Sequence, residues 1–227
     1  MSFIRGDGLR KVYDPEGKAV EALHNVNFRI EKGEFVSILG PSGCGKSTLL
    51  MICAGLEEIS DGSLMVAERE MTGPREDVGI MFQDPTLLPW KTVLENVLFP
   101  ARIARAPIEP VRQRVSICRA LVNDPGILLM DEPFSALDAI TRDQMNVLLL
   151  DLWQRQQTRT ALFITHSIRE AVLLSDRIFV MTRRPATIVK DVSVPFPRPR
   201  SPELTEGVEF NRLCSHLRGM IEESHVG

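Results

Sequence analysis

A glycine-rich stretch from Gly40 to Thr48, GPSGCGKST, fits the pattern G-x-x-x-x-G-K-[S/T]. Its glycines let the backbone curl so that successive N–H groups point inward toward an anion. Lys46 would reach the β- and γ-phosphates of a nucleotide, and the hydroxyl of Ser47 would ligate Mg²⁺. A chance glycine-rich turn is the alternative, but a buried strand precedes the stretch and a helix follows it, as this chemistry requires. The residues predicted to bind the phosphates are Gly40, Pro41, Ser42, Gly43, Cys44, Gly45, Lys46, Ser47 and Thr48.

Two adjacent carboxylates, Asp131 and Glu132, end the apolar run ILLM at 127–130. One carboxylate can hold Mg²⁺ through water, and the next, at the exit of a strand, can polarise an attacking water molecule. Neighbouring strand residues point to opposite faces, but the strand ends here, so both side chains can face a nucleotide. An acidic pair at a strand end is also common in solvated turns. Because this pair follows a phosphate loop, we predict a metal ligand in Asp131 and a catalytic residue in Glu132.

Two further polar residues follow predicted strands. His166, in ALFITHS, comes after a buried strand, and Gln83, in GIMFQD, ends another. Ligands of α/β proteins bind at the carboxyl ends of parallel strands, so both residues are expected at the same sheet edge as Lys46. We predict that His166 contacts the γ-phosphate and that the Gln83 amide serves the metal and the water. The alternative for a lone histidine is a structural role beside a helix cap.

Helices alternate with short apolar strands along most of the chain, which predicts an α/β fold with a largely parallel central sheet. Strands are predicted at 20–30, 35–39, 62–68, 77–83, 127–130, 161–165 and 177–182. Helices are predicted at 46–56, 92–104, 110–123, 138–157 and 167–175. The proline-rich stretch PFPRPRSP at 195–202 breaks this pattern. Beyond it, the spacing of Phe210, Leu213, Leu217 and Ile221 predicts one amphipathic helix.

The composition narrows the possible classes of protein. The chain has 227 residues, of which 44% are apolar and 25% charged, as in ordinary globular domains. A net charge of −3 gives no case for a nucleic-acid partner. The four cysteines have no paired or metal-ligand spacing, which favours free thiols. No window reaches the roughly 18 apolar residues of a membrane span, and we expect other proteins to hold the chain at any membrane where it acts.

Together, these motifs resemble those of the nucleotide-binding subunit of ATP-binding cassette (ABC) transporters. GPSGCGKST is similar to Walker A, MFQD with Gln83 to the Q-loop and ILLMDEP to Walker B, while SALD at 135–138 is similar to the D-loop and ITHS with His166 to the switch histidine. These matches follow the family order over about residues 3–190. The resemblance implies a P-loop NTPase (RecA-like) core with a mostly parallel sheet and an added antiparallel β part. It also implies ATP and Mg²⁺ as ligands and a stacking contact between Tyr13 and adenine, although a strand tyrosine can also serve packing alone.

Two stretches, DPTLLPWKTVLENV and THSIREAVLLSDRIFVM, are most similar to importer subunits for nitrate, sulfonate or taurine. This implies three partners: transmembrane permease subunits, a periplasmic or extracellular solute-binding protein, and a second ATPase subunit. It also implies a peripheral position at the cytoplasmic face of the membrane. The apolar run Leu87, Leu88, Pro89 and Trp90 is expected to dock on the permease, with local packing under a helix as the alternative. The ATP-binding domain is predicted at 1–194, followed by a linker and helical tail at 195–227.

One element of the family pattern is absent from the sequence. The family places an all-helical subdomain between Q-loop and Walker B, and this subdomain ends in a signature resembling L-S-G-G-Q directly before a basic helix. Here VRQRVSICRALVNDP matches that helix, but residues 107–111 read PIEPV and no such signature occurs in the sequence. The subdomain is therefore predicted to be truncated to about 92–123, with room for about two helices. A natural deletion and a sequence error both explain the missing segment.

The missing signature matters because two subunits of this family bind ATP head to tail. Each ATP lies between Walker A of one subunit and the signature of the other. We therefore expect impaired hydrolysis and a weakened dimer. The leading hypothesis is the energy-coupling ATPase subunit of an importer, and the alternative is a nucleotide-binding but hydrolytically inactive regulatory or degenerate subunit. A soluble ABC protein of DNA repair or translation usually carries two cassettes or long insertions, and a generic P-loop kinase leaves SALD and His166 unexplained.

Overall fold

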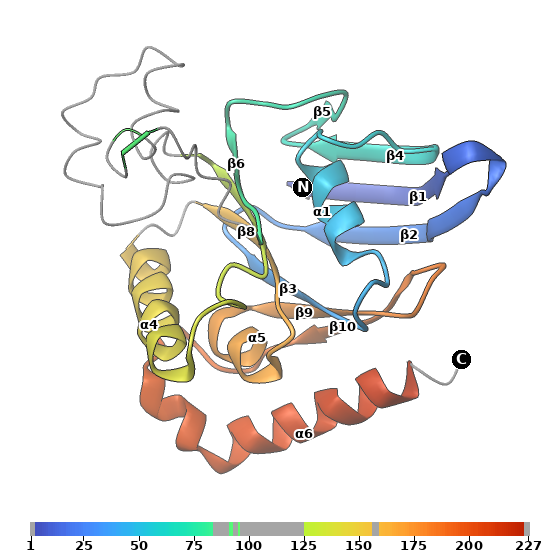
Figure 1. Ribbon diagram of the computed structural model, residues 1–227. Helices are drawn as coiled ribbons and strands as arrows, with labels where there is room; N and C mark the ends of the chain where they lie inside the picture. The colour runs from blue at the N-terminus through green and yellow to red at the C-terminus, as the bar shows by residue number, and fades with distance from the viewer. Residues whose placement is uncertain (1–2, 84–90, 93–94, 96–124, 156–158, 225–227) are drawn as a thin grey trace.

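The computed structural model describes residues 3–83, 91–92, 95, 125–155 and 159–224 (Figure 1). The predicted helix at 110–123, the apolar run at 87–90 and most of the predicted helix at 92–104 lie outside these residues. The start of the latter helix is described. The Thr92 hydroxyl accepts a hydrogen bond from the Glu95 N–H, and the Glu95 carboxylate accepts one from the Thr92 N–H. This reciprocal pair has the pattern of a capping box, which is typical of the N-terminus of a helix.

The central sheet has the strand order β10-β9-β3-β8-β7-β6. Its strands are β3 (Phe35–Leu39), β6 (Val78–Met81), β7 (Ile127–Asp131), β8 (Thr160–Ile164), β9 (Arg177–Met181) and β10 (Ile188–Ser193). All neighbouring strands pair in parallel except β10, which runs antiparallel to β9. The predicted α/β fold with a mostly parallel sheet is therefore confirmed. Strand β10 was not predicted from the sequence.

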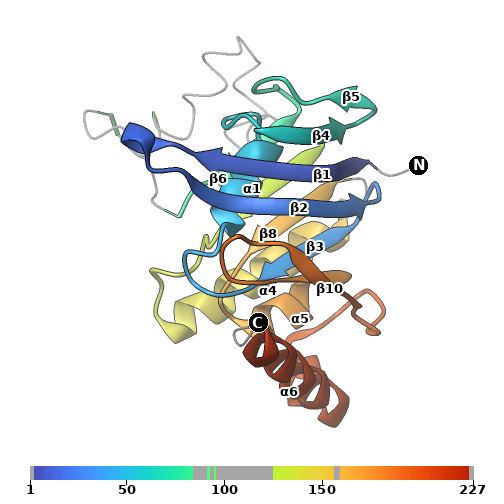
Figure 2. The ribbon, with the colours of Figure 1, turned by 90° about the vertical axis from the view of Figure 1, so that its right-hand side faces the viewer.

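A second, antiparallel sheet has the order β2-β1-β4-β5. Its strands are β1 (Ile4–Tyr13), β2 (Val20–Ile30), β4 (Asp61–Val66) and β5 (Arg69–Glu70), and a short 3-10 turn, η1 (Pro15–Gly17), joins β1 to β2. Figure 2 shows this sheet and helix α1 (Lys46–Cys53) together on one side of the central sheet. The additional antiparallel β part implied by the resemblance is thus present. Helix α1 ends three residues before the predicted Leu56.

Three helices cover the other face of the central sheet: α4 (Ala139–Arg155), α5 (Ile168–Leu174) and α6 (Val208–Glu223), with the 3-10 turn η3 (Pro202–Glu206) before α6 (Figure 1). Alternate residues of the central strands face the two sides. Val36 and Ile38 belong to the core that includes α1, while Phe35 and Leu39 belong to the core that includes α4, α5 and α6. Both faces are therefore buried, which explains why these strands are apolar throughout. No helix in the described part of the chain is long and apolar enough to cross a membrane.

Candidate functional site

The phosphate loop joins the carboxyl end of β3 to the first residue of α1, as the motif requires. Two of its glycines are fixed by close backbone approaches. A Cβ at Gly40 would lie 2.9 Å from the Met181 carbonyl oxygen, and a Cβ at Gly45 would lie 3.0 Å from that of Ala22. Gly45 also has a φ of 130°, which L side chains rarely adopt. The loop therefore packs closely against strands β9 and β2. The first N–H groups of helix α1, which have no partner within the helix, lie beside it.

Lys46 is a buried cation at the centre of this loop. Its side chain is only 5% exposed, and Nζ donates hydrogen bonds to the carbonyl oxygens of Gly40 at 2.9 Å and Pro41 at 2.8 Å. The neutral carbonyl groups hold the ammonium group across the loop without neutralising it. A polyphosphate bound against the loop would therefore meet a positive charge that is already positioned and partly desolvated.

Asp131, the last residue of β7, places a carboxylate beside the loop. It is 5% exposed, and its Oδ1 is buried without a hydrogen-bond partner among the described residues. Burial raises the pKa of Asp131, while a hydrogen bond with Ser47 and the charge of Lys46 oppose this rise. A buried carboxylate oxygen without a donor is a fitting ligand for a hard cation. Asp131 and Ser47, which the sequence predicts as Mg²⁺ ligands, are therefore brought together and fit that ion.

The described residues contain no cluster of three or more His, Cys, Asp or Glu side chains that could hold a metal ion by themselves. This is compatible with Mg²⁺, which in nucleotide sites usually takes one or two protein ligands and completes its shell with phosphate oxygens and water. Gln83 lies exposed two residues beyond β6, next to β7 at the same sheet edge. In the described part of the chain, no hydrogen bond joins the Gln83 side chain to Ser47 or Asp131, and its predicted role as a ligand stays a prediction.

Glu132 and His166 meet in the structure. His166 Nε2 lies 2.6 Å from Glu132 Oε1, and the side chains are 47% and 11% exposed, respectively. Glu132 has a φ of 46°, an uncommon conformation for a residue other than glycine, and its N–H donates to the Ile164 carbonyl oxygen at 3.0 Å. Such strained residues cluster at functional sites because the surrounding structure must hold them in place. With this backbone, the Glu132 side chain lies against His166, which follows strand β8.

Tyr13 ends strand β1 in the antiparallel sheet and is half-buried. The ammonium group of Lys11 lies 4.7 Å from the centre of its ring and forms a salt bridge with Glu57 at 2.5 Å. The ring thus has a protein cation on one side. The predicted stacking of Tyr13 on adenine stays a prediction.

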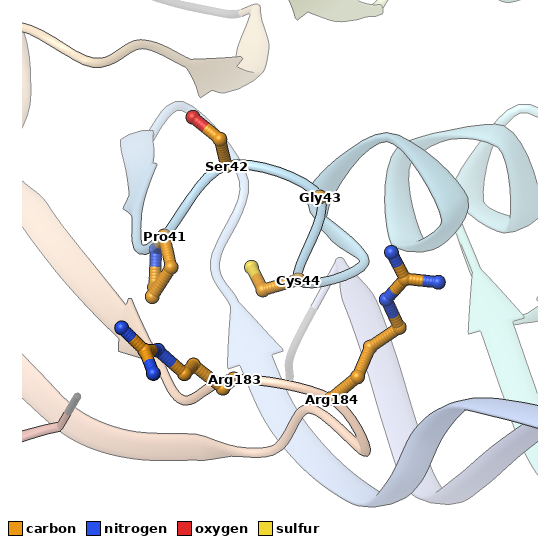
Figure 3. A pocket seen from close by; sticks show the side chains of 6 residues that line it. All are labelled: Pro41, Ser42, Gly43, Cys44, Arg183 and Arg184. Carbon is orange, nitrogen blue, oxygen red and sulfur yellow. The ribbon is translucent and has the colours of Figure 1, made fainter. Parts of the chain in front are cut away.

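Two arginines that the sequence did not single out also flank the loop. Arg183 and Arg184, between β9 and β10, line a cavity of about 540 Å³ together with loop residues 41–44 (Figure 3). Arg184 Nη2 would lie 3.3 Å from a Cβ at Gly43. Both arginines are exposed, and neither guanidinium group has a hydrogen-bond or ion-pair partner among the described residues. The sequence does contain a signal for these residues, because two consecutive arginines directly follow the predicted strand at 177–182.

Comparison with known proteins gives consistent relationships. A family model described as ABC transporter matches residues 23–135. The chain is 39% identical to an uncharacterized ABC transporter ATP-binding protein, MJ0412, of Methanocaldococcus jannaschii, over 94% of this chain and 90% of that protein. It is 37% identical to the aliphatic sulfonates import ATP-binding protein SsuB of Bacillus cereus, over 97% of this chain and 98% of that protein.

A third relative is the taurine import ATP-binding protein TauB of Pelagibacter ubique, which is 38% identical over 86% of this chain and 84% of its own length. Among solved structures, the fold is similar to the dimeric ATP-binding cassette MJ0796 bound to ADP and Pi, with a TM-score of 0.75 and 28% identity. That match covers 86% of this chain and all of the other. The alignments with MJ0412 and SsuB extend over 242 and 247 positions, more than the 227 residues of the chain, so both relatives contain residues that face gaps in it.

Proposed function

The chain belongs to the ATP-binding cassette (ABC) transporter family, whose ATP-binding members are ATPases coupled to transport, and from this premise we propose that it is the energy-coupling subunit of a sulfonate or taurine importer. The names of two relatives, an aliphatic sulfonates import protein (SsuB) and a taurine import protein (TauB), support this solute class. They favour it over nitrate, which the sequence patterns also allowed. The proposed partners are transmembrane permease subunits, an extracytoplasmic solute-binding protein and a second ATP-binding subunit. The proposed location is peripheral, at the cytoplasmic face of the membrane.

The single observation that carries the nucleotide assignment is a pair of buried, opposite charges at one edge of the central sheet, where Lys46 begins α1 after β3 and Asp131 ends β7. Lys46 is held by two loop carbonyls, and Asp131 carries a carboxylate oxygen with no protein donor in the described structure. Without a ligand, both groups are desolvated at a cost to stability. Mg²⁺-bound ATP would satisfy both, since its phosphates would meet Lys46 and its metal would meet Asp131 and Ser47. Bound Mg²⁺ would neutralise phosphate charge and orient the phosphate chain.

We assign the remaining roles to side chains around this pair. Glu132 would hold the attacking water and accept its proton, because its carboxylate is nearly buried and follows directly on the metal ligand. His166 would contact the γ-phosphate after parting from Glu132, and Gln83 would complete the shell of the water and the metal. The N–H groups at the start of α1 would face the phosphates. Tyr13 would stack on the adenine ring.

We further propose that the isolated chain hydrolyses ATP poorly. In the family, the signature serine and glycines of the opposing subunit present a hydroxyl group, N–H groups and a helix N-terminus to the γ-phosphate. The sequence at 107–111 offers instead two prolines, neither of which has a backbone N–H to donate, and the acidic Glu109. The gaps in the alignments with longer relatives support a lost internal segment. A regulatory subunit that binds ATP without useful turnover is the second candidate, favoured by this same observation.

Co-purification tests the transport assignment. The chain is co-expressed with the permease subunits of a sulfonate or taurine importer from the same organism, and the membrane fraction is solubilised and captured through a tag on the permease. The proposal expects the chain in the captured complex, with or without ATP. Recovery of the chain only in the soluble fraction, free of any permease, would count against an importer and leave the ATP site to be judged by nucleotide binding.

A further inference from the structure

A second cavity, of about 210 Å³, lies beside Glu132 and His166. Three of the residues that line it, Arg142, Thr165 and Glu170, have no assigned role in the site. They come from three different elements: helix α4, the end of strand β8 and the first turn of helix α5. One shared role would explain why Arg142, Thr165 and Glu170 converge on this small cavity.

Glu170 is an unusual residue for its position, because a glutamate on this short helix is only 6% exposed. Burial raises the pKa of Glu170, while Thr165 and Arg142 act against this rise. A leucine at this position would avoid the cost of desolvating a carboxyl group. Packing of helix α5 alone does not require a carboxylate at position 170, and burying one costs desolvation free energy.

The local sequence Ser167-x-x-Glu170 is that of a capping box, in which the glutamate would accept the N–H of the serine. Only half of the box forms. Ser167 Oγ accepts from the Glu170 N–H at 3.3 Å, but the Ser167 N–H donates to Thr165 Oγ1 at 3.0 Å. The Glu170 carboxylate instead accepts the hydroxyl of Thr165. Ser167 thus caps the helix through its hydroxyl group, while Thr165 accepts the Ser167 N–H and the Glu170 carboxylate holds Thr165, the residue before His166.

Arg142 connects the same carboxylate to the segment that follows Glu132. Its Nη2 donates to the Leu137 carbonyl oxygen at 2.8 Å and its Nε to that of Phe134 at 3.3 Å, while Nε lies 3.8 Å from Glu170 Oε1. Ser135 Oγ in turn donates to the Glu132 carbonyl oxygen at 2.9 Å. The contacts close a ring that runs from Glu132 through segment 134–137, Arg142, Glu170 and Thr165 to His166, which returns to Glu132.

We propose that Glu170 and Arg142 are positioning residues that hold Glu132 and His166 in contact and couple segment 134–137 to the position of His166. The roles of Glu132 and His166 in hydrolysis are those of the proposed function, on which this inference rests. Because Glu170 does not line the phosphate-loop cavity, its loss should leave nucleotide binding intact and affect the step after binding. A displacement of about 1 Å between reacting groups commonly costs about 100-fold in rate.

The test compares three variants with the wild-type chain. Glu170→Ala removes the carboxylate, Glu170→Gln keeps an acceptor for Thr165, and Val172→Ala removes volume from the core on the same helix without touching the ring. The first readout is the ¹⁵N NMR signal of the His166 imidazole nitrogens, measured in the absence of nucleotide. A His166→Gln variant, which lacks this signal, assigns it. We expect Glu170→Ala to shift this signal, while Glu170→Gln and Val172→Ala leave it at the wild-type position.

The second readout separates binding from turnover. Each variant is mixed with an intact homologous subunit that carries the signature, and the ATP dissociation constant and hydrolysis rate are measured. Glu170→Ala should lower the rate by about 100-fold and change ATP affinity by less than about twofold, as expected for a distant site. If Glu170→Ala does not fold, Thr165→Val replaces it, because valine keeps the shape and removes the hydroxyl group.

An unchanged His166 signal in Glu170→Ala, or a loss of rate equal to that of Val172→Ala, overturns the positioning role. The NMR result decides this inference without any hydrolysis. A wild-type chain that fails to bind ATP would instead defeat the proposed function, so the two failures are distinguishable.

Discussion

Replacing Lys46 by alanine should abolish most nucleotide affinity. The Lys46 ammonium group is buried and pre-positioned by two carbonyl oxygens at 2.8 and 2.9 Å, so the alanine variant removes a charge that needs little reorganisation to meet a phosphate. Truncating one partner of a buried, hydrogen-bonded charge pair costs about 2–5 kcal/mol. At 1.4 kcal/mol for each factor of ten, the dissociation constant for Mg²⁺-ATP should rise at least about 30-fold and up to several thousandfold.

The assay is a titration with a fluorescent ATP analogue, with Mg²⁺ and again with excess EDTA. Lys46→Met keeps most of the side-chain volume and separates the loss of charge from the collapse of the loop. Lys190→Ala is the matched control, because Lys190 is an exposed lysine on β10 outside the phosphate-loop cavity. Equal binding by wild type and Lys46→Met would refute the assignment of this loop as the phosphate site.

Three further predictions concern the metal ligand, the C-terminal segment and docking. Asp131→Asn should remove Mg²⁺-dependent ATP binding yet stabilise the metal-free chain by about 1 kcal/mol, or roughly 3 °C in Tm. Because the folded-state pKa of Asp131 is raised, this carboxyl group stabilises the fold fully below its ordinary pKa of about 4 and loses that contribution as pH rises through the raised value. The advantage of Asp131→Asn in thermal unfolding should therefore grow as pH rises from about 4, and an advantage that shrinks would contradict this account. Arg200 is buried, burial lowers its pKa to about 10, and it donates to the carbonyl oxygens of Ser175 at 2.7 Å and Leu173 at 3.1 Å. Arg200→Ala should thus lower the free energy of unfolding by about 3 kcal/mol in urea denaturation, whereas an effect below about 0.5 kcal/mol would mean that the segment after Pro195 contributes little. Trp90→Ala should reduce recovery of the chain with its permease while ATP affinity stays unchanged, and undiminished recovery would exclude the docking role of Leu87–Trp90.

The sequence predicted the strands of the central sheet best where both faces are buried. Strands β3, β7 and β8 read as short apolar runs because each side chain enters one of two cores. Strands β1 and β10 were missed for a different reason. Strand β1 contains two glycines and several charged residues and pairs with β2 through register shifts, so it has no clean alternation. Strand β10 is an edge strand with four exposed residues.

The parts of the candidate site that could be predicted are those whose residues lie close together in the sequence. The phosphate loop and Asp131 follow from strand, turn and helix order, and the shared sheet edge follows from the parallel sheet. The contact between Glu132 and His166 was not predictable, because it depends on a left-handed backbone at Glu132. Arg183 and Arg184 approach the loop only because β9 lies next to β3, and strand order is not encoded in any local pattern.

Steady-state phosphate release tests the central claim most directly. Wild type and Glu132→Gln, which serves as the control for contaminating ATPase, are measured alone and after mixing with an intact homologous subunit. Losing one preorganised donor costs roughly a hundred- to a thousandfold in rate, and several are missing here. We therefore predict that the chain alone binds ATP but turns over far below about 1 s⁻¹, and that the intact subunit restores turnover at one site of the mixed pair. Ordinary turnover by the chain alone that Glu132→Gln abolishes would contradict the account, because it would show that the missing segment is dispensable.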